Sequence, residues 1–477
     1  MSESNSTVEI SSDAASRRRL ATMRAASAAL RDAGRWAEAG QVASDTPNTM
    51  PTASDPVDGG NLAELVYVVG GPRPRARRRG RGHERLEAPS PRRDLAVRVM
   101  LLVNHGYERE LVVQLATEML ETSDSSDPGT LWYALLALAY ADEIARAQEH
   151  VDRAVSRQPA DASLWHTCSL TLLRARIAWL SGDLGTGYAV LARLLATGDV
   201  HPRFLGLAVA WMVAALVELG DLDRARDLLS RYNLASSSIG AADRAELLAA
   251  RGALYHASGQ PRAAREEYLS CGAELLAFSV VNPAVISWRA PAALCARELR
   301  WDGMAVALAQ EELIEARRWG TRRTHGRALQ AMAMVDADND VELLTDAVEL
   351  LSGPTMQREL TSAQYELGIR LNARRHYERG TRALRSARRA AVSIGSRGWQ
   401  RRIDSAERYW RPSGGARTLT PRETTFALLA RAGLSNREIG GRLHVTDRTV
   451  EFHLSNVYRK LGIAGRDQLR SVALPSV

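Results

Sequence analysis

Lysine is almost absent from this chain of 477 residues. Of the 63 basic residues, Lys460 is the only lysine, and the others are arginines. A P-loop needs a lysine that reaches the nucleotide phosphates, and kinases and pyridoxal enzymes need one for catalysis. Receiver domains normally keep a lysine too, and the chain shows no alternating strand–helix pattern. The sequence therefore predicts neither an ATP-driven protein nor a standard response regulator.

Cysteines and long apolar runs are also scarce. Cys168, Cys271 and Cys295 lie far apart without paired spacing, which favours reduced structural thiols over disulfides or a zinc site. The longest apolar run, Phe204 to Val217, is shorter than a helix that spans a bilayer. The N-terminus is polar and shows no signal peptide. We therefore expect a cytoplasmic protein without a membrane partner.

Catalytic and metal-binding constellations are missing as well. Four histidines occur singly and without metal-ligand spacing, and five tryptophans have the positions of core residues rather than of a ligand cage. The histidines are His150, His166, His201 and His256, and the tryptophans are Trp132, Trp165, Trp179, Trp211 and Trp288. We expect no metal, no cofactor and no enzymatic activity.

Near the C-terminus, helix-capping signals follow one another closely. Thr420-Pro421-Arg422-Glu423 is a capping box with proline at the first helical position, and Ser435-Asn436-Arg437-Glu438 is a second one. Gly433 stops the first helix, the second ends near Leu443, and Thr446 or Asp447 caps a third. This order of helix, tight turn and longer helix is typical of a helix-turn-helix.

The third helix of this segment divides into two faces at 100° per residue. A buried stripe is predicted at Val450, Leu454, Val457 and Leu461. The opposite face holds Arg448, Glu451, Phe452, Ser455 and Arg459. An aromatic ring in a solvent face is unusual, but it fits a face that enters the major groove and meets a thymine methyl group.

The same segment resembles the LuxR-type helix-turn-helix. The matching markers are Leu419, Thr420, Arg422, Glu423, Gly433, Ser435, Asn436, Glu438, Ile439, Leu443, Thr449, Val450, His453, Lys460, Leu461 and Arg466. The resemblance implies a four-helix domain whose third helix reads DNA and whose fourth, from about Arg466 to Ala473, mediates dimer contacts. By position, the base-reading residues are Glu451, Phe452 and Ser455. Glu451 departs from the lysine that is frequent there, so the operator sequence does not carry over from the family.

We therefore expect double-stranded DNA as a partner, bound by a homodimer. The predicted DNA-binding residues are Ser435, Asn436, Arg437, Arg448, Thr449, Glu451, Phe452, His453, Ser455, Asn456 and Arg459. Arginine dominates the segment before this domain, with 12 arginines against 3 acidic residues over 374–411. A basic C-terminal third suits a protein that touches phosphate at that end, although such runs are also common on solvated helix faces.

The body of the chain shows breaks at a regular spacing. They fall at 141–142, 182–183, 220–221, 259–260, 301–302, 339–340 and 375–376, about 35 to 43 residues apart. Such a period predicts a tetratricopeptide-like solenoid, which presents a surface for a protein, peptide or small-molecule signal. These repeats resemble the helical-repeat half of the large ATP-dependent LuxR-family regulators, without the ATPase.

The predicted fold class is all-α, a helical solenoid followed by a four-helix DNA-binding domain. The predicted parts are an N-terminal helical segment and loop (1–60), an arginine-rich disordered segment (61–95), the repeats (96–411), a linker (412–417) and the helix-turn-helix domain (418–477). The predicted function is sequence-specific transcriptional regulation. The alternative is an interaction scaffold whose terminal domain serves mainly for pairing.

Overall fold

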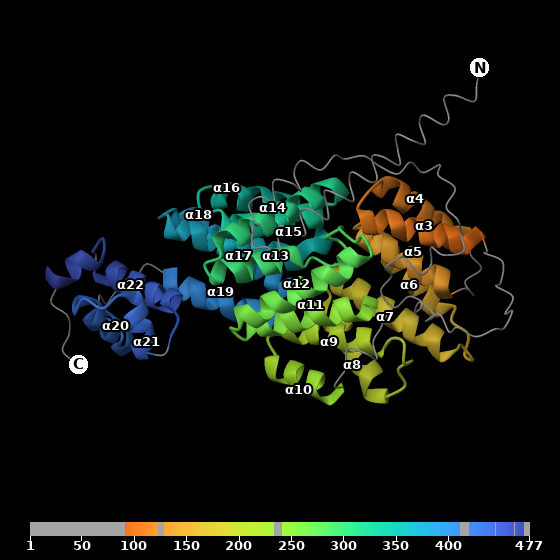
Figure 1. Ribbon diagram of the computed structural model, residues 1–477, viewed down its shortest axis with the longest axis horizontal. Coiled ribbons are helices and arrows are strands. Elements are labelled where there is room, and N and C mark those ends of the chain that lie inside the picture. Colours follow the sequence, from red (N-terminus) through yellow and green to blue (C-terminus); the bar gives the residue numbers. More distant parts are fainter. Residues whose placement is uncertain are drawn as a thin grey trace, which may run out of the picture. The chain divides into compact units, whose positions relative to one another are not determined.

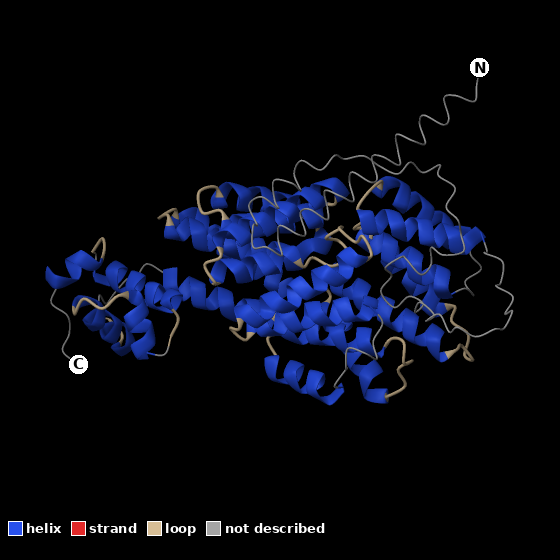
Figure 2. Cartoon of the chain, in the orientation of Figure 1, coloured by secondary structure: helices blue, strands red, loops and turns tan. Residues whose placement is uncertain are grey.

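In the computed structural model the chain divides into two compact units, Met1–Ile403 and Asp404–Val477. The structure describes residues 91–122, 128–232, 241–410, 419–443, 445–461 and 463–471. Every regular element in these ranges is a helix (Figure 2), as the all-α prediction requires. The expectations for 1–60, 61–90 and the linker 412–417 lie outside the described residues. Residues 91–95 open the first described helix, so the prediction that they belong to a disordered segment is wrong.

The first unit is built from helices that pair along the chain (Figure 1). The pairs are α3 (Pro91–His105) with α4 (Arg109–Thr122), α5 (Pro128–Tyr140) with α6 (Ile144–Ser156), α7 (Leu164–Ser181) with α8 (Leu184–Thr197), α9 (Leu205–Leu219) with α10 (Leu222–Tyr232), α11 (Ala241–Ala257) with α12 (Pro261–Ala277), α13 (Arg289–Glu298) with α14 (Asp302–Trp319), α15 (Arg322–Val335) with α16 (Asp340–Leu350), and α17 (Gln357–Ala373) with α18 (Tyr377–Ser393). A 3-10 turn, η2 (Pro354–Met356), precedes α17, and α19 (Arg397–Trp410) follows α18.

All seven predicted breaks are confirmed, because each one separates the two helices of a pair. The turn after α7 shows the local cause. Gly182 has a left-handed backbone with φ 92°, which L side chains rarely adopt, and the amide of Asp183 returns to the Ala178 carbonyl at 2.9 Å. The Asp183 side chain then caps α8 by accepting from the Thr186 amide at 3.0 Å. The α3–α4 pair, with its turn at Gly106, was not among the predicted breaks.

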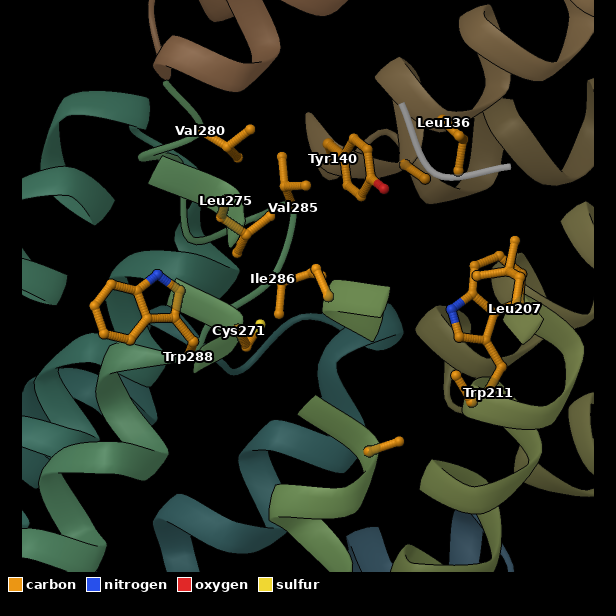
Figure 3. Close-up of a cluster of buried hydrophobic side chains, with 14 of the residues drawn as sticks. Leu136, Tyr140, Leu207, Trp211, Cys271, Leu275, Val280, Val285, Ile286 and Trp288 are labelled. Carbon is orange, nitrogen blue, oxygen red and sulfur yellow. The ribbon is translucent and has the colours of Figure 1, made fainter. Parts of the chain in front are cut away.

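The core of the first unit is continuous over many helices. Figure 3 shows Tyr140 of α5, Trp211 of α9 and Cys271 of α12 in one buried cluster with Trp288. Four of the five predicted core tryptophans are buried, and Trp165 is half-buried against the same cluster. The three cysteines are buried and unpaired, and burial raises the pKa of each thiol.

Hydrogen bonds join segments of the first unit that lie far apart in the chain. The Trp319 indole N–H donates to the Tyr140 carbonyl at 2.8 Å, across 179 residues. Asn282 donates to the Val103 carbonyl at 2.7 Å, also across 179 residues. The recurrence of this separation indicates that the helical pairs complete one superhelical turn in roughly 180 residues.

The second unit contains the end of α19 and the C-terminal domain. Its helices are α20 (Pro421–Arg431), α21 (Asn436–Leu443) and α22 (Asp447–Leu461), followed by the 3-10 segment η3 (Arg466–Ser471). A small core joins them, with Phe426 of α20, Ile439 of α21, Val450 and Val457 of α22 and Leu469 of η3 each 0% exposed. This core sets the angle at which α22 presents its outer face.

Candidate nucleic-acid interface

The first helix of the C-terminal domain starts with a complete capping box. The Glu423 amide donates to the Thr420 hydroxyl at 3.2 Å, and the Thr420 amide donates to a Glu423 carboxylate oxygen at 2.7 Å. Burial alone would raise the pKa of Glu423. Hydrogen bonds from Lys460 and Thr420 outweigh that effect and lower the pKa below its ordinary value. This carboxylate is therefore held charged between α20 and α22.

The turn between the first two helices and the start of the second follow the predicted signals. Gly433 has φ 93°, which ends α20. Ser435 and Glu438 form the second capping box, with a backbone hydrogen bond of 2.7 Å in one direction and 3.3 Å in the other. Thr446 caps α22 by accepting from the Thr449 amide at 3.2 Å. The three helices thus begin where the sequence places them.

Helix α22 presents a buried and an exposed face. Val450, Leu454 and Val457 are buried as predicted, and Leu461 is half-buried. The exposed residues on the other side are Arg448, Glu451, Phe452 and Ser455. Phe452 is 47% exposed, which makes it one of the few large apolar side chains on the surface of the described residues. The exposed face therefore offers a cation, a carboxylate, a hydroxyl and an aromatic ring within two helical turns.

Two predicted DNA-binding residues of α22 point inward instead. Asn456 is 6% exposed and accepts a hydrogen bond from Arg459 at 3.2 Å. His453 is half-buried and stacks on Phe426, with ring centroids 4.3 Å apart. Burial and the nearby charge of Arg422 lower the pKa of His453. At 100° per residue His453 lies beside the buried stripe, whereas Asn456 lies nearer the exposed face and is covered by its neighbours.

The remaining predicted residues differ in exposure, and Arg459 of α22 is half-buried. Ser435, which caps α21, and Arg437 of α21 are exposed, while Asn436 is half-buried and accepts from Arg466 at 3.0 Å. The Thr449 hydroxyl lies 2.8 Å from that of Thr446. Asn436 therefore links α21 to η3, and Thr449 belongs to the N-terminal cap of α22.

Tyr409, which the sequence did not indicate, lies against the exposed face of α22. The Tyr409 ring, from the end of α19, stacks on Phe452 with ring centroids 4.7 Å apart and planes inclined by 22°. The Arg459 guanidinium lies 5.3 Å from the centroid of the same tyrosine. In the sequence, only the adjacent aromatic residues Tyr409 and Trp410 pointed to such a contact. Two neighbouring aromatic residues do not show which residue they pack against.

The single lysine of the chain has a structural role. Lys460 Nζ donates to Glu423 Oε2 at 2.5 Å, and the two side chains are 18% and 9% exposed. This contact ties the C-terminal part of α22 to the capping box of α20. The exposed basic residues of α21 and α22 are Arg437, Arg442 and Arg448, whereas the lysine is directed inward.

The described residues contain no cluster of three metal-ligating side chains. None of their helices has the length and apolar character needed to cross a membrane.

Comparison with known proteins places the C-terminal domain in a family. Residues 417–473 match the family described as "Bacterial regulatory proteins, luxR family". Two proteins named "Putative HTH-type transcriptional regulator", from Mycobacterium bovis and Mycobacterium tuberculosis, are each 51% identical over 59 residues, 12% of this chain. The match spans about 7% of the length of those relatives. The chain thus carries a LuxR-family helix-turn-helix domain, of the kind found in DNA-binding transcriptional regulators.

The body resembles a solved helical-repeat protein. The structure titled "Crystal Structure of Rap Protein Complexed with Competence and Sporulation Factor" superposes with a TM-score of 0.52. The similarity covers 79% of this chain and 99% of that one, at 11% sequence identity. The helical-repeat prediction for the body is therefore confirmed at the level of the fold.

Proposed function

We propose that this protein is a cytoplasmic, sequence-specific transcriptional regulator that binds double-stranded DNA as a homodimer. The observation that carries the proposal is the exposed face of α22, where Arg448, Glu451, Phe452 and Ser455 lie outward from a packed helix-turn-helix core. Base edges of the major groove are read by such a mixture of charged, polar and apolar side chains. The helical repeats receive the signal or docking partner that controls this domain.

Contacts to phosphate and to bases divide along this face. Arg448 lies at the N-terminal end of α22 and Arg437 on α21, both exposed, so they are suited to the phosphate backbone. Glu451 and Phe452 lie between the ends, where a carboxylate accepts from a cytosine amino group and a ring contacts a thymine methyl group. The described geometry therefore supports backbone positioning by the arginines and sequence reading by Glu451 and Phe452.

Salt-dependent binding of the full chain to duplex DNA tests the proposal. Fluorescence anisotropy with a labelled duplex, taken from the DNA upstream of the gene for this protein, should show saturable binding. Arg448→Ala should reduce the slope of log affinity against log salt by about one. The exposed Arg385 of α18 provides a matched control, Arg385→Ala, whose slope should equal that of the unmodified chain. Absence of DNA binding by a chain that still dimerises would instead support the interaction scaffold.

A further inference from the structure

The first unit contains a cavity at a place where several of its helices meet. It has a volume of about 390 Å³ and is lined by residues of α9, α11, α15, α17 and α19. That volume lies within the range of small-molecule sites and is too small for a folded partner. Its lining combines arginines, an amide, a hydroxyl and an indole ring.

The two carboxylates at this cavity already have cationic partners. Glu359 accepts from Arg323 at 2.8 Å and from Arg358 at 2.6 Å. Glu218 accepts from Arg358 at 3.2 Å, which links α17 to α9 across 140 residues. Burial would raise the pKa of Glu359, but the arginines lower it to about 2. These acids are therefore satisfied by Arg323 and Arg358.

Two other arginines at the cavity have no such partner. Within the described residues, no carboxylate lies at ion-pair distance from Arg327 or Arg402, and neither guanidinium makes a hydrogen bond that the structure records. Arg327 is half-buried on α15, and burial and the charge of Arg358 lower its pKa. A cation in this position is stabilised by an added negative charge.

The rest of the lining complements an anion that carries a flat apolar part. Trp399 is half-buried, and the Arg402 guanidinium lies 5.1 Å from its ring centroid. Gln330 donates to the Ser362 hydroxyl at 2.7 Å, and this pair adds polar groups to the same wall. A guanidinium is suited to carboxylate or phosphate, and an indole to a planar group.

We propose that this cavity is a binding site for a small organic anion, whose carboxylate or phosphate pairs with Arg327 and Arg402 while its apolar part lies against Trp399. The inference rests on the proposed sensory role of the repeats and gives that role a ligand class. The described geometry assigns the site to the first unit alone, so it can be tested without DNA.

A charged and a neutral dye with the same rings test the proposal on the full chain. The charged probe is 8-anilinonaphthalene-1-sulfonate, and the neutral one is N-phenyl-1-naphthylamine. We expect saturable fluorescence enhancement by the sulfonate at one site per chain, with the neutral dye bound about tenfold more weakly. Inorganic phosphate and benzoate are the competitors, and the stronger of them identifies the preferred acid group.

Variants locate the dye. Arg327→Met and Arg402→Met should each weaken sulfonate binding about tenfold or more, and Arg385→Met, on an exposed helix face, should leave it unchanged. Circular dichroism reports whether each variant is folded. Arg402 is exposed, so Arg402→Met tests the site even if Arg327→Met disturbs folding. The proposal is overturned by the absence of saturable binding, or by equal affinity in Arg402→Met and Arg385→Met. DNA binding is measured in a separate experiment. A failure of dye binding therefore leaves the DNA-binding result valid, and a failure of DNA binding leaves the dye-binding result valid.

Discussion

The Tyr409 ring lies face to face with Phe452 on the outer side of the helix proposed to read DNA, with centroids 4.7 Å apart. A base pair that contacts Phe452 from that side must displace the tyrosine. Stacked aromatic pairs contribute about 0.5–1.5 kcal/mol. The contact is therefore strong enough to tune DNA affinity and weak enough to be broken by DNA.

Removal of this ring should strengthen DNA binding. Tyr409→Ala is expected to raise affinity for duplex DNA about two- to tenfold, because the competing stack is lost. Tyr377→Ala, which removes an exposed tyrosine of α18, is the control. Anisotropy titrations at one salt concentration compare the three proteins. Weaker binding by Tyr409→Ala would show that the tyrosine assists the interface instead.

The buried ion pairs of the first unit should contribute strongly to its stability. Glu359→Gln leaves Arg323 and Arg358 without their shared carboxylate and should lower the free energy of unfolding by about 3 kcal/mol or more. Glu378→Gln, at an exposed position, is the control and should change it little. Urea unfolding followed by tryptophan fluorescence measures both.

The same carboxylate predicts a pH dependence. The pKa of Glu359 is lowered to about 2, so its contribution is complete above the ordinary glutamate pKa of 4.5 and is lost as pH falls from 4.5 toward 2. Glu359→Gln should therefore show a shallower loss of stability across this range. Parallel curves for the variant and the unmodified chain would contradict the assignment.

Close approach of helices in a pair predicts a steric effect at Gly326. A Cβ there would lie 2.6 Å from Leu351 Cγ, so Gly326→Ala should destabilise the first unit by about 1–3 kcal/mol. Gly303 has no atom within 4 Å of its would-be Cβ, and Gly303→Ala should be neutral or slightly stabilising. Thermal unfolding of the two variants gives the comparison, and similar shifts in both would refute tight packing at Gly326.

The contact between Lys460 and Glu423 predicts a local effect in the C-terminal domain. Lys460→Met should lower the free energy that protects the backbone amides of 419–471 from hydrogen exchange by about 1–3 kcal/mol. The reason is that Glu423 is left partly buried without its cation. Arg442→Met, at an exposed position of α21, should have no such effect. Hydrogen exchange in the full chain distinguishes the two, and unchanged protection in Lys460→Met would show that the contact contributes nothing.

Features governed by local chemistry were accessible from the sequence. The turn at Gly182-Asp183 and the capping box at Thr420 depend on residues within one helical turn, so their positions were predicted correctly. The inward direction of Asn456 was not, because its angle on α22 lies near the border between the two faces, and the core of the domain decides it.

Contacts that depend on the summed rotations of many helix pairs could not be predicted from the sequence. The hydrogen bond between Trp319 and Tyr140 exists because small rotations of successive helix pairs add up to a full turn, and no single repeat encodes that sum. The cavity beside Arg327 is also formed where several helices meet. Likewise, the partner of Tyr409 lies 43 residues further along the chain, and nothing in the local sequence specifies it.

Binding-site selection from random duplexes tests the central claim most directly, namely that the outer face of α22 reads DNA sequence. The full chain should enrich a defined sequence motif, and Glu451→Ala should lose preference at one base pair, where a wrong base costs about 1–3 kcal/mol. Phe452→Ala should lose preference at a neighbouring position. Arg442→Ala should keep the motif of the unmodified chain. An unchanged motif in both Glu451→Ala and Phe452→Ala, with the domain still folded, would contradict the account.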